Sequence, residues 1–167
     1  MFQESYIVDG EKEELIAIIR NHINQSSLFS LKGKALSENQ FEVYSKFRLW
    51  VMRPNFGPLV YTQILVERDM TMRTSKVTFK RKNGMTYKFH FWLTIVFATS
   101  MALGVFGSFL WNQGLDFPIG ILAIIGVIIG YIFIMELITA ASVYRSMKKI
   151  REAFENAGHS SKKAMTR

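Results

Sequence analysis

Few side chains in this sequence could carry acid–base, nucleophilic or metal chemistry, and those present are widely spaced. The three histidines are His22, His90 and His159, whose separations match no metal-ligand pattern, and cysteine is absent. Glu67 and Asp69 lie two residues apart, in a segment whose composition predicts a solvated turn. The sequence contains no glycine-rich phosphate loop and no serine nucleophile elbow. We therefore predict no catalytic residue, no metal site and no cofactor, and we expect that the protein is not an enzyme.

Two long windows without a formal charge are the most informative feature of the chain. One covers residues 91–115 and reads FWLTIVFATSMALGVFGSFLWNQGL, and the other covers residues 117–135 and reads FPIGILAIIGVIIGYIFIM. A helix needs about 20 mostly apolar residues to cross the hydrocarbon core of a bilayer. We therefore predict a transmembrane hairpin at residues 89–139, with spans of about 89–111 and 117–138 joined by a short turn.

Basic residues gather just outside one end of each predicted span. The chain carries a net charge of +8, yet residues 1–72 hold eight basic and nine acidic side chains. Residues 73–88 hold six basic side chains and no acid, and residues 145–167 hold seven basic and two acidic ones. Cytoplasmic flanks of membrane spans are enriched in Lys and Arg, so this pattern predicts that both termini lie in the cytoplasm.

The same basic flanks predict contact with anionic lipid headgroups, which attract each nearby Lys or Arg by about 1 kcal/mol. A nucleic-acid interface would instead spread such residues over one face of a folded domain, so we expect no nucleic-acid partner. The membrane-surface flank consists of Lys80, Arg81, Lys82, Lys88, Arg145, Lys148 and Lys149.

Two ionisable residues, His90 and Glu136, lie closest to the hydrocarbon on the cytoplasmic side. Ionisable residues in a membrane are costly and often functional, so a proton or ion pathway is one reading. Counting about 1.5 Å per residue from Phe117 places Glu136 about 28 Å along the second span, which is the cytoplasmic boundary. This depth favours an interfacial polar anchor, in which His90 and Glu136 face each other or Lys88 across the hairpin.

Small residues recur at helical spacing in both predicted spans. Ser100, Gly104 and Ser108 repeat every four residues in the first span, and Gly126 and Gly130 form a GxxxG pair in the second. Helices in lipid gain no hydrophobic energy by associating, so small residues permit the close contact that holds them together. We expect the two faces to meet inside one hairpin. The alternative is that one face meets a second copy or another subunit.

The segment before the hairpin, residues 1–88, predicts a small cytoplasmic α+β domain. Apolar residues at helical spacing predict a helix over residues 11–24. The apolar stripe of this helix would cover one face of an antiparallel meander of four strands. Alternating apolar and polar residues place those strands at about 28–36, 41–49, 60–67 and 70–81.

Residues 140–167 predict a cytoplasmic amphipathic helix followed by a polar tail. Val143, Met147, Ile150 and Phe154 follow one another at intervals of four, three and four, so the second span should continue as a helix beyond the membrane. Such a helix can lie on the membrane surface or pack against the sheet or a partner, and its mild excess of basic charge favours packing. The last ten residues, GHSSKKAMTR, are expected to be frayed.

The order of these parts resembles that of many small bacterial membrane proteins, which implies a bacterial inner membrane but no activity. We expect a membrane-anchored interaction module or accessory subunit that presents its domain at the membrane surface to a protein partner or a second copy. The alternative is a small oligomeric transport or channel component, assembled through the glycine-rich faces of its spans.

Overall fold

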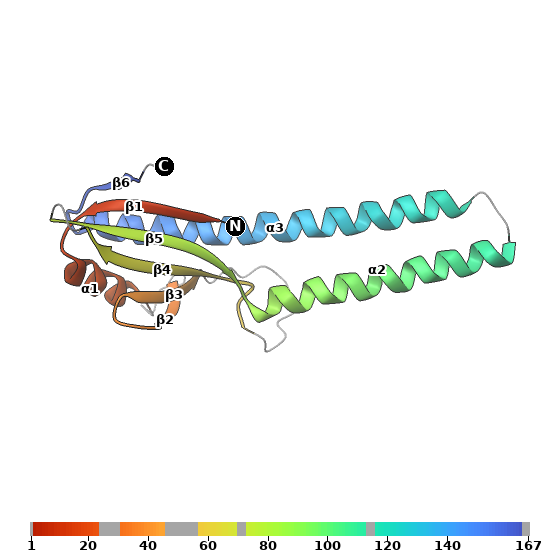
Figure 1. Cartoon of the computed structure of the whole chain (residues 1–167), viewed down its shortest axis with the longest axis horizontal. Coiled ribbons are helices and arrows are strands. Elements are labelled where there is room, and N and C mark those ends of the chain that lie inside the picture. Colours follow the sequence, from red (N-terminus) through yellow and green to blue (C-terminus); the bar gives the residue numbers. More distant parts are fainter. Residues whose placement is uncertain (1, 24–30, 46–56, 70–72, 113–115, 165–167) are drawn as a thin grey trace.

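The computed structural model describes residues 2–23, 31–45, 57–69, 73–112 and 116–164. It has an α+β fold, in which two of three helices extend from an antiparallel sheet as a long hairpin (Figure 1). In chain order the elements are β1 (Gln3–Asp9), α1 (Lys12–His22), β2 (Leu31–Ala35), β3 (Gln40–Ser45), β4 (Val60–Arg68), β5 (Thr74–Asn83), α2 (Met85–Asn112), α3 (Asp116–Asn156) and β6 (Ser161–Lys163).

The six described strands form one antiparallel sheet in the order β2-β3-β4-β5-β1-β6. Strands β2 to β5 follow one another in chain order, which confirms the predicted meander. Strand β1 then pairs with β5, with Gln3 opposite Lys80, and β6 pairs with the free side of β1, with Tyr6 opposite Lys163. Parts of the predicted strands that fall at residues 28–30, 46–49 and 70–72 lie outside the described residues.

The predicted sheet lacks β1 and β6, and the expectation of a frayed tail is wrong for Ser161–Lys163. This three-residue strand has no apolar residue that would reveal it in the sequence. It forms because β1 offers a free edge, where the amide of Asp9 donates to the Ser160 carbonyl (3.0 Å) and the amide of Ala164 donates to the Ser5 carbonyl (2.9 Å). Such a short strand is stable only when an existing sheet supplies its hydrogen bonds.

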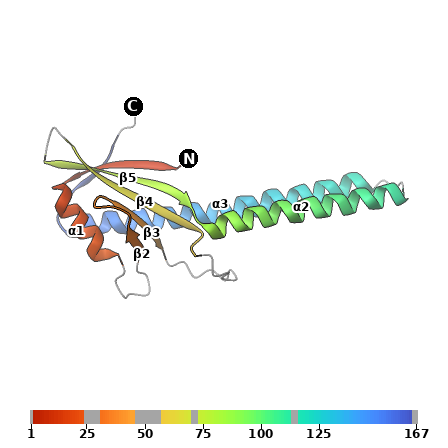
Figure 2. The ribbon, with the colours of Figure 1, turned by 60° about the horizontal axis from the view of Figure 1, so that its bottom comes forward.

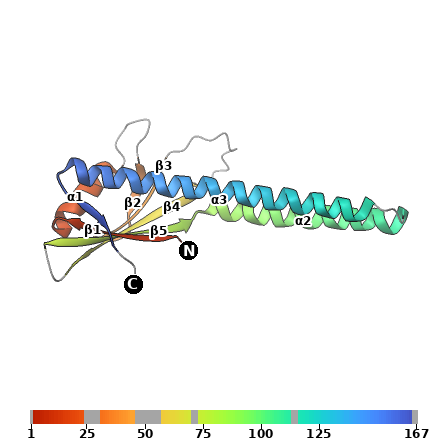
Figure 3. The same cartoon turned by 90° about the horizontal axis from the view of Figure 1, so that it is seen from above.

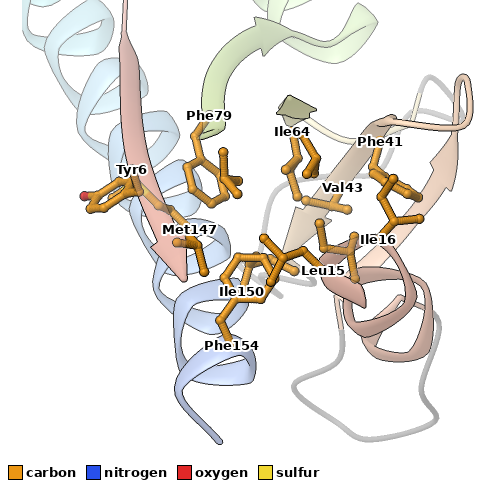
Figure 4. Close-up of a cluster of buried hydrophobic side chains, with 14 of the residues drawn as sticks. Tyr6, Leu15, Ile16, Phe41, Val43, Ile64, Phe79, Met147, Ile150 and Phe154 are labelled. Atoms are coloured by element: carbon orange, nitrogen blue, oxygen red, sulfur yellow. The ribbon is translucent and has the colours of Figure 1, made fainter. Parts of the chain in front are cut away.

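One hydrophobic core lies between the sheet and two helices. Alternate residues of strands β3, β4 and β5, such as Val43, Ile64 and Phe79, point toward α1 and the C-terminal part of α3 and are completely buried (Figure 4). The predicted helix at residues 11–24 corresponds to α1, whose Leu15 and Ile19 are also fully buried. Both helices lie on the same side of strands β1 and β5 (Figure 3), and no helix of the described residues covers the other face of the sheet.

Helix α3 is a single continuous helix of 41 residues, about 60 Å long at 1.5 Å per residue. Its C-terminal part contacts α1, β3 and β4. Val143, Met147, Ile150 and Phe154 are each at most 3% exposed, so the amphipathic stripe predicted for this segment packs on the chain's own sheet. Burying a side chain of this size stabilises the fold by roughly 1.5–3 kcal/mol.

The hairpin of α2 and α3 is long and apolar enough to cross a membrane twice. Within the described residues, the candidate spans are Met85–Gly107 and Gly120–Asn156, and only 0% and 6% of their apolar windows are buried. The two helices run side by side away from the domain (Figure 2) and expose large side chains such as Trp92, Leu103 and Phe133. An exposed apolar surface of this extent is unfavourable in water and suits a lipid environment.

Candidate functional site: the polar junction of hairpin and domain

The junction between the hairpin and the sheet is built around the carboxylate of Glu136. Arg81 donates from both terminal guanidinium nitrogens to Glu136, with Nη1 2.5 Å from Oε2 and Nη2 3.0 Å from Oε1. The Tyr87 hydroxyl donates to Oε1 at 2.6 Å. These residues come from β5, α3 and the first turn of α2, so one carboxylate joins three elements.

The strand register explains why Arg81 reaches this carboxylate. Residues 77, 79 and 81 of β5 share one face of the strand, and Val77 and Phe79 are fully buried beneath the helices. Arg81 therefore points to the helix side at the end of the strand, where its Nε also donates to Asn83 Oδ1 (2.8 Å) and its guanidinium lies 5.4 Å from the centre of the Tyr87 ring. The hydrogen-bonded Glu136 carboxylate raises the pKa of Arg81, although burial opposes this effect.

His90 lies one turn into α2 from this cluster and has a different partner. Its Nδ1 is 2.8 Å from the hydroxyl of Tyr131 on α3, and its Nε2 is a buried atom without a hydrogen-bond partner in the described part of the chain. The expectation that His90 and Glu136 face each other or Lys88 is therefore wrong. Each of them instead bonds to a tyrosine on the opposite helix, and Glu136 also binds Arg81. Their role as anchors at the membrane interface stays a prediction.

A small cavity lies between α2 and α3 beside this junction. Its volume of about 10 Å³ is room for about one water molecule. Such a cavity cannot hold a substrate, and it gives the polar junction no ligand pocket. The lining residues are Tyr87, Phe91, Thr94, Tyr131, Ile132 and Met135.

The expectation that the small residues of the two spans face each other across the hairpin is wrong for the three glycines. A side-chain methyl placed on Gly104, Gly126 or Gly130 would meet no atom within 4 Å. Among the described glycines of the hairpin, Gly120 is the one that lies close to the other helix, since such a methyl would lie 3.2 Å from Val105. The hydroxyl of Ser100 is bonded to a carbonyl of its own helix, and the side chain of Ser108 lies outside the described part. At Gly104, Gly126 and Gly130 the small faces are therefore open to the surroundings of the hairpin.

The predicted basic flank is divided between internal pairs and exposed residues. Arg81 binds Glu136, Lys82 forms an ion pair with Glu42, and Lys148 lies 3.7 Å from Glu152 on the same helix. Arg145 and Lys88 are exposed, whereas Lys80 and Lys149 are partly buried. Arg81 and Lys82 already pair with carboxylates of the chain, so they are less available to lipid headgroups than the exposed residues. Contact of the whole flank with lipid headgroups stays a prediction.

Glu42 is a buried carboxylate that the strand pattern alone does not reveal. It lies on the face of β3 opposite the core, yet its side chain is only 5% exposed. Burial raises the pKa of Glu42, but hydrogen bonds from Lys82 and Gln63 outweigh that effect and leave the pKa below its ordinary value. The signal in the sequence is its position as an acidic residue between Phe41 and Val43 in the strand QFEVYS.

The two histidines outside the hairpin, His22 and His159, each place Nδ1 within hydrogen-bond distance of a backbone carbonyl. His22 Nδ1 lies 3.1 Å from the Ile18 carbonyl, and His159 Nδ1 lies 2.6 Å from the Asp9 carbonyl. Within the described ranges, no three His, Cys, Asp or Glu side chains come together in a group that could hold a metal ion.

No protein-family model, curated protein or solved structure matches this chain. The polar junction joins both helices of the hairpin to the sheet through the Glu136 carboxylate.

Proposed function

We propose that the protein is a membrane-anchored interaction module that holds its α+β domain in one orientation at the membrane surface. The single observation that supports this most is the continuity of α3. The same helix supplies a candidate membrane span and, in its last four turns, buried core residues of the domain such as Ile150 and Phe154. A continuous helix transmits the orientation of the span directly to the sheet, whereas a flexible linker would only limit the distance between them.

A second connection supports a fixed orientation. The ion pair between Arg81 and Glu136 ties the end of β5 to α3, and Tyr87 ties the start of α2 to the same carboxylate. The hairpin therefore enters the domain at two points, through the β5–α2 connection and through α3. Rotation of the domain about either helix alone would break this bidentate pair.

We further propose that the domain and both termini lie in the cytoplasm, at a bacterial inner membrane. The pairing of β1 with β6 brings both described ends of the chain into the same domain (Figure 1). Both ends therefore lie at the end of the hairpin that joins the sheet. The excess of Lys and Arg at residues 73–88 supports a cytoplasmic side for that end. An interaction module at this position raises the local concentration of its partner beside the membrane.

A small oligomeric transport or channel component is the second candidate. The observation that favours it is the outward position of Gly104, Gly126 and Gly130, which leaves space for another helix to approach closely. Two helices alone cannot enclose a pore, so this function requires several copies or a further subunit.

Isolation of native complexes in mild detergent separates the two candidates. We expect the wild-type chain to be recovered with a larger partner, and we expect Gly126→Leu/Gly130→Leu to leave that recovery unchanged. A channel component would instead be recovered as an oligomer of itself, which the two leucines would disrupt. Recovery of the wild-type chain as a monomer without a partner would contradict both proposals.

The fixed orientation has its own test. A spin label on the sheet of the protein in nanodiscs should give a narrow distance distribution to a label near Gly104, and inserting four Gly-Ser pairs after Ala140 should broaden it. The same insertion at Ser37, in the exposed β2–β3 turn, is the matched control. Equal distributions in the wild type and both insertions would overturn the oriented attachment.

A further inference from the structure

The sheet face opposite the core is rich in lysine. Side chains along a strand alternate between the two faces of the sheet, so the residues between the buried ones lie on this face. Cross-strand pairs such as Gln63 opposite Lys80 confirm that these residues share one face. We call this surface the lysine face. It carries Lys32, Lys34, Lys76, Lys80, Lys82 and Lys162.

Few carboxylates balance these six lysines. The acidic residues that alternation places on the same face are Asp9, Glu42 and Glu67. Glu42 is buried and already pairs with Lys82, and Glu67 lies opposite Lys76 without forming an ion pair with it. Within the described residues, Lys32, Lys80 and Lys162 likewise form no ion pair, so the lysine face is a surface of net positive charge.

The direction of this face argues against lipid as its occupant. Strand β5 runs alongside α3, in the direction of the hairpin (Figures 1 and 3), so the side chains of its outer face point sideways rather than toward a membrane crossed by that hairpin. Lys76 and Lys82 are six residues apart, which separates them by about 20 Å along the strand. The attraction of a charged membrane surface fades over about 8 Å at physiological salt, so a bilayer beside Lys82 would not reach Lys76.

The side-chain chemistry also argues against nucleic acid. Proteins favour Arg for bidentate binding of phosphate. Arg81 of β5 points to the helix side of the sheet, so within the described strands the basic residues of the lysine face are all lysines. The aromatic pair on the face, Tyr44 and Tyr61, packs edge to face with ring centres 5.8 Å apart. Its rings contact each other and are not laid out as separate platforms for stacked bases.

We propose that the lysine face binds an acidic polypeptide segment of a partner protein. This inference deepens the proposed function, because it names the surface and the chemistry of the partner that the membrane anchor would hold. Exposed carboxylates of such a segment, placed along β5, would pair with Lys76 and Lys80 and reach Lys162 across β1. The attraction between opposite charges would steer the partner onto this face.

Amine labelling in native membranes tests the proposal without knowledge of the partner. Acetylation of Lys76, Lys80 and Lys162 by an amine-reactive ester should be roughly fivefold slower in native membranes than in purified protein in neutral-lipid nanodiscs, because a bound partner excludes solvent from the interface. Lys12, on helix α1, should react at the same rate in both samples. A wash in about 1 M salt should remove the protection, since it shortens the Debye length to about 3 Å.

Each other occupant gives a result that would overturn the proposal. Protection that reappears in nanodiscs of anionic lipid identifies the membrane, and protection that appears when the purified protein is concentrated identifies a second copy. Loss of protection after nuclease treatment identifies nucleic acid. Equal labelling of Lys76, Lys80 and Lys162 in native and purified samples means that nothing covers the face.

A pair of charge-reversal variants completes the test, with Lys162 as the reporter. Lys76→Glu/Lys80→Glu should abolish the protection of Lys162 in native membranes, while the control Lys12→Glu/Arg20→Glu, on helix α1, should preserve it. Equal unfolding temperatures of the two variants establish that both are folded. If both variants kept Lys162 protected, the proposal would be wrong. The spin-label distances test the oriented attachment separately, so failure of one inference can be told from failure of the other.

Discussion

Arg81 on β5 and Glu136 on α3 lie 55 residues apart in the sequence and form a bidentate ion pair at 2.5 and 3.0 Å. The side chain of Arg81 is 16% exposed and that of Glu136 is 45% exposed, so the pair is partly shielded from water. It lies where the hairpin joins the sheet, and it adds to the core packing of α3 that holds the two parts together.

Removal of the Glu136 charge should therefore destabilise the junction. We expect Glu136→Gln to lower the free energy of unfolding by about 1–2 kcal/mol, less than for a fully buried pair because Glu136 is partly solvated. Glu152→Gln is the matched control, since its pair with Lys148 is exposed on one helix and should contribute at most about 0.5 kcal/mol. Thermal unfolding in nanodiscs measures both. Equal losses in the two variants would show that the junction has no special role.

The C-terminal turns of α3 should be essential to the domain. Phe154 is fully buried in the core, so we expect Phe154→Ala to destabilise the sheet by about 3–5 kcal/mol. Phe133 lies on the same helix but is 62% exposed within the candidate span, and Phe133→Ala should leave the sheet unchanged. Hydrogen exchange of the β4 and β5 amides reports the stability of the domain. Slow exchange in Phe154→Ala would mean that the domain folds without this helix.

Glu42 should make the stability of the domain depend on pH. Its pKa in the folded protein is lowered from 4.5, although burial opposes the hydrogen bonds from Lys82 and Gln63 that lower it. Between the two pKa values the unfolded chain binds more protons, so the contribution is complete above about pH 4.5 and is lost as the pH falls through the folded value. Urea midpoints in nanodiscs from pH 7 to pH 3 should fall more steeply for the wild type than for Glu42→Gln. Parallel curves for the two proteins would contradict this assignment.

The glycines of the hairpin should differ in their tolerance of larger residues. Gly120→Leu places a side chain against Val105, where even a methyl would lie 3.2 Å away, so we expect a loss of about 1–3 kcal/mol. Gly126→Leu/Gly130→Leu meets open space within the chain and should not lower the unfolding temperature. Unfolding temperatures in detergent micelles check this ranking. A reversed order would mean that the two helices approach each other at Gly126 and Gly130 instead.

Much of the architecture could be predicted from the sequence because it depends on local patterns. The uncharged windows predicted the long helices α2 and α3, and the alternation from Val60 to Val66 predicted the buried face of β4. The residues with a period of 3.6 in α3 predicted its buried stripe. In each case the types and spacing of residues close together in the sequence indicate which side of one element avoids water.

The contacts of the candidate site could not be predicted in this way. Nothing near Glu136 in the sequence indicates that Arg81 is its partner, and nothing in SKK indicates a strand. The glycine pattern predicted close helix packing but did not indicate which helix would pack there. In the structure, no atom of the chain lies close to Gly126 or Gly130.

The sequence by itself determined which segments avoid water and with what period, since side-chain type and spacing decide those properties residue by residue. Only the tertiary structure decided that Arg81 meets Glu136, that Glu42 is buried beside Lys82, and that the two ends of the chain pair in one sheet. These contacts join residues 40 or more positions apart along the chain, or strands from its opposite ends. They exist only when packing of the whole core sets the distance and direction between the elements that carry them.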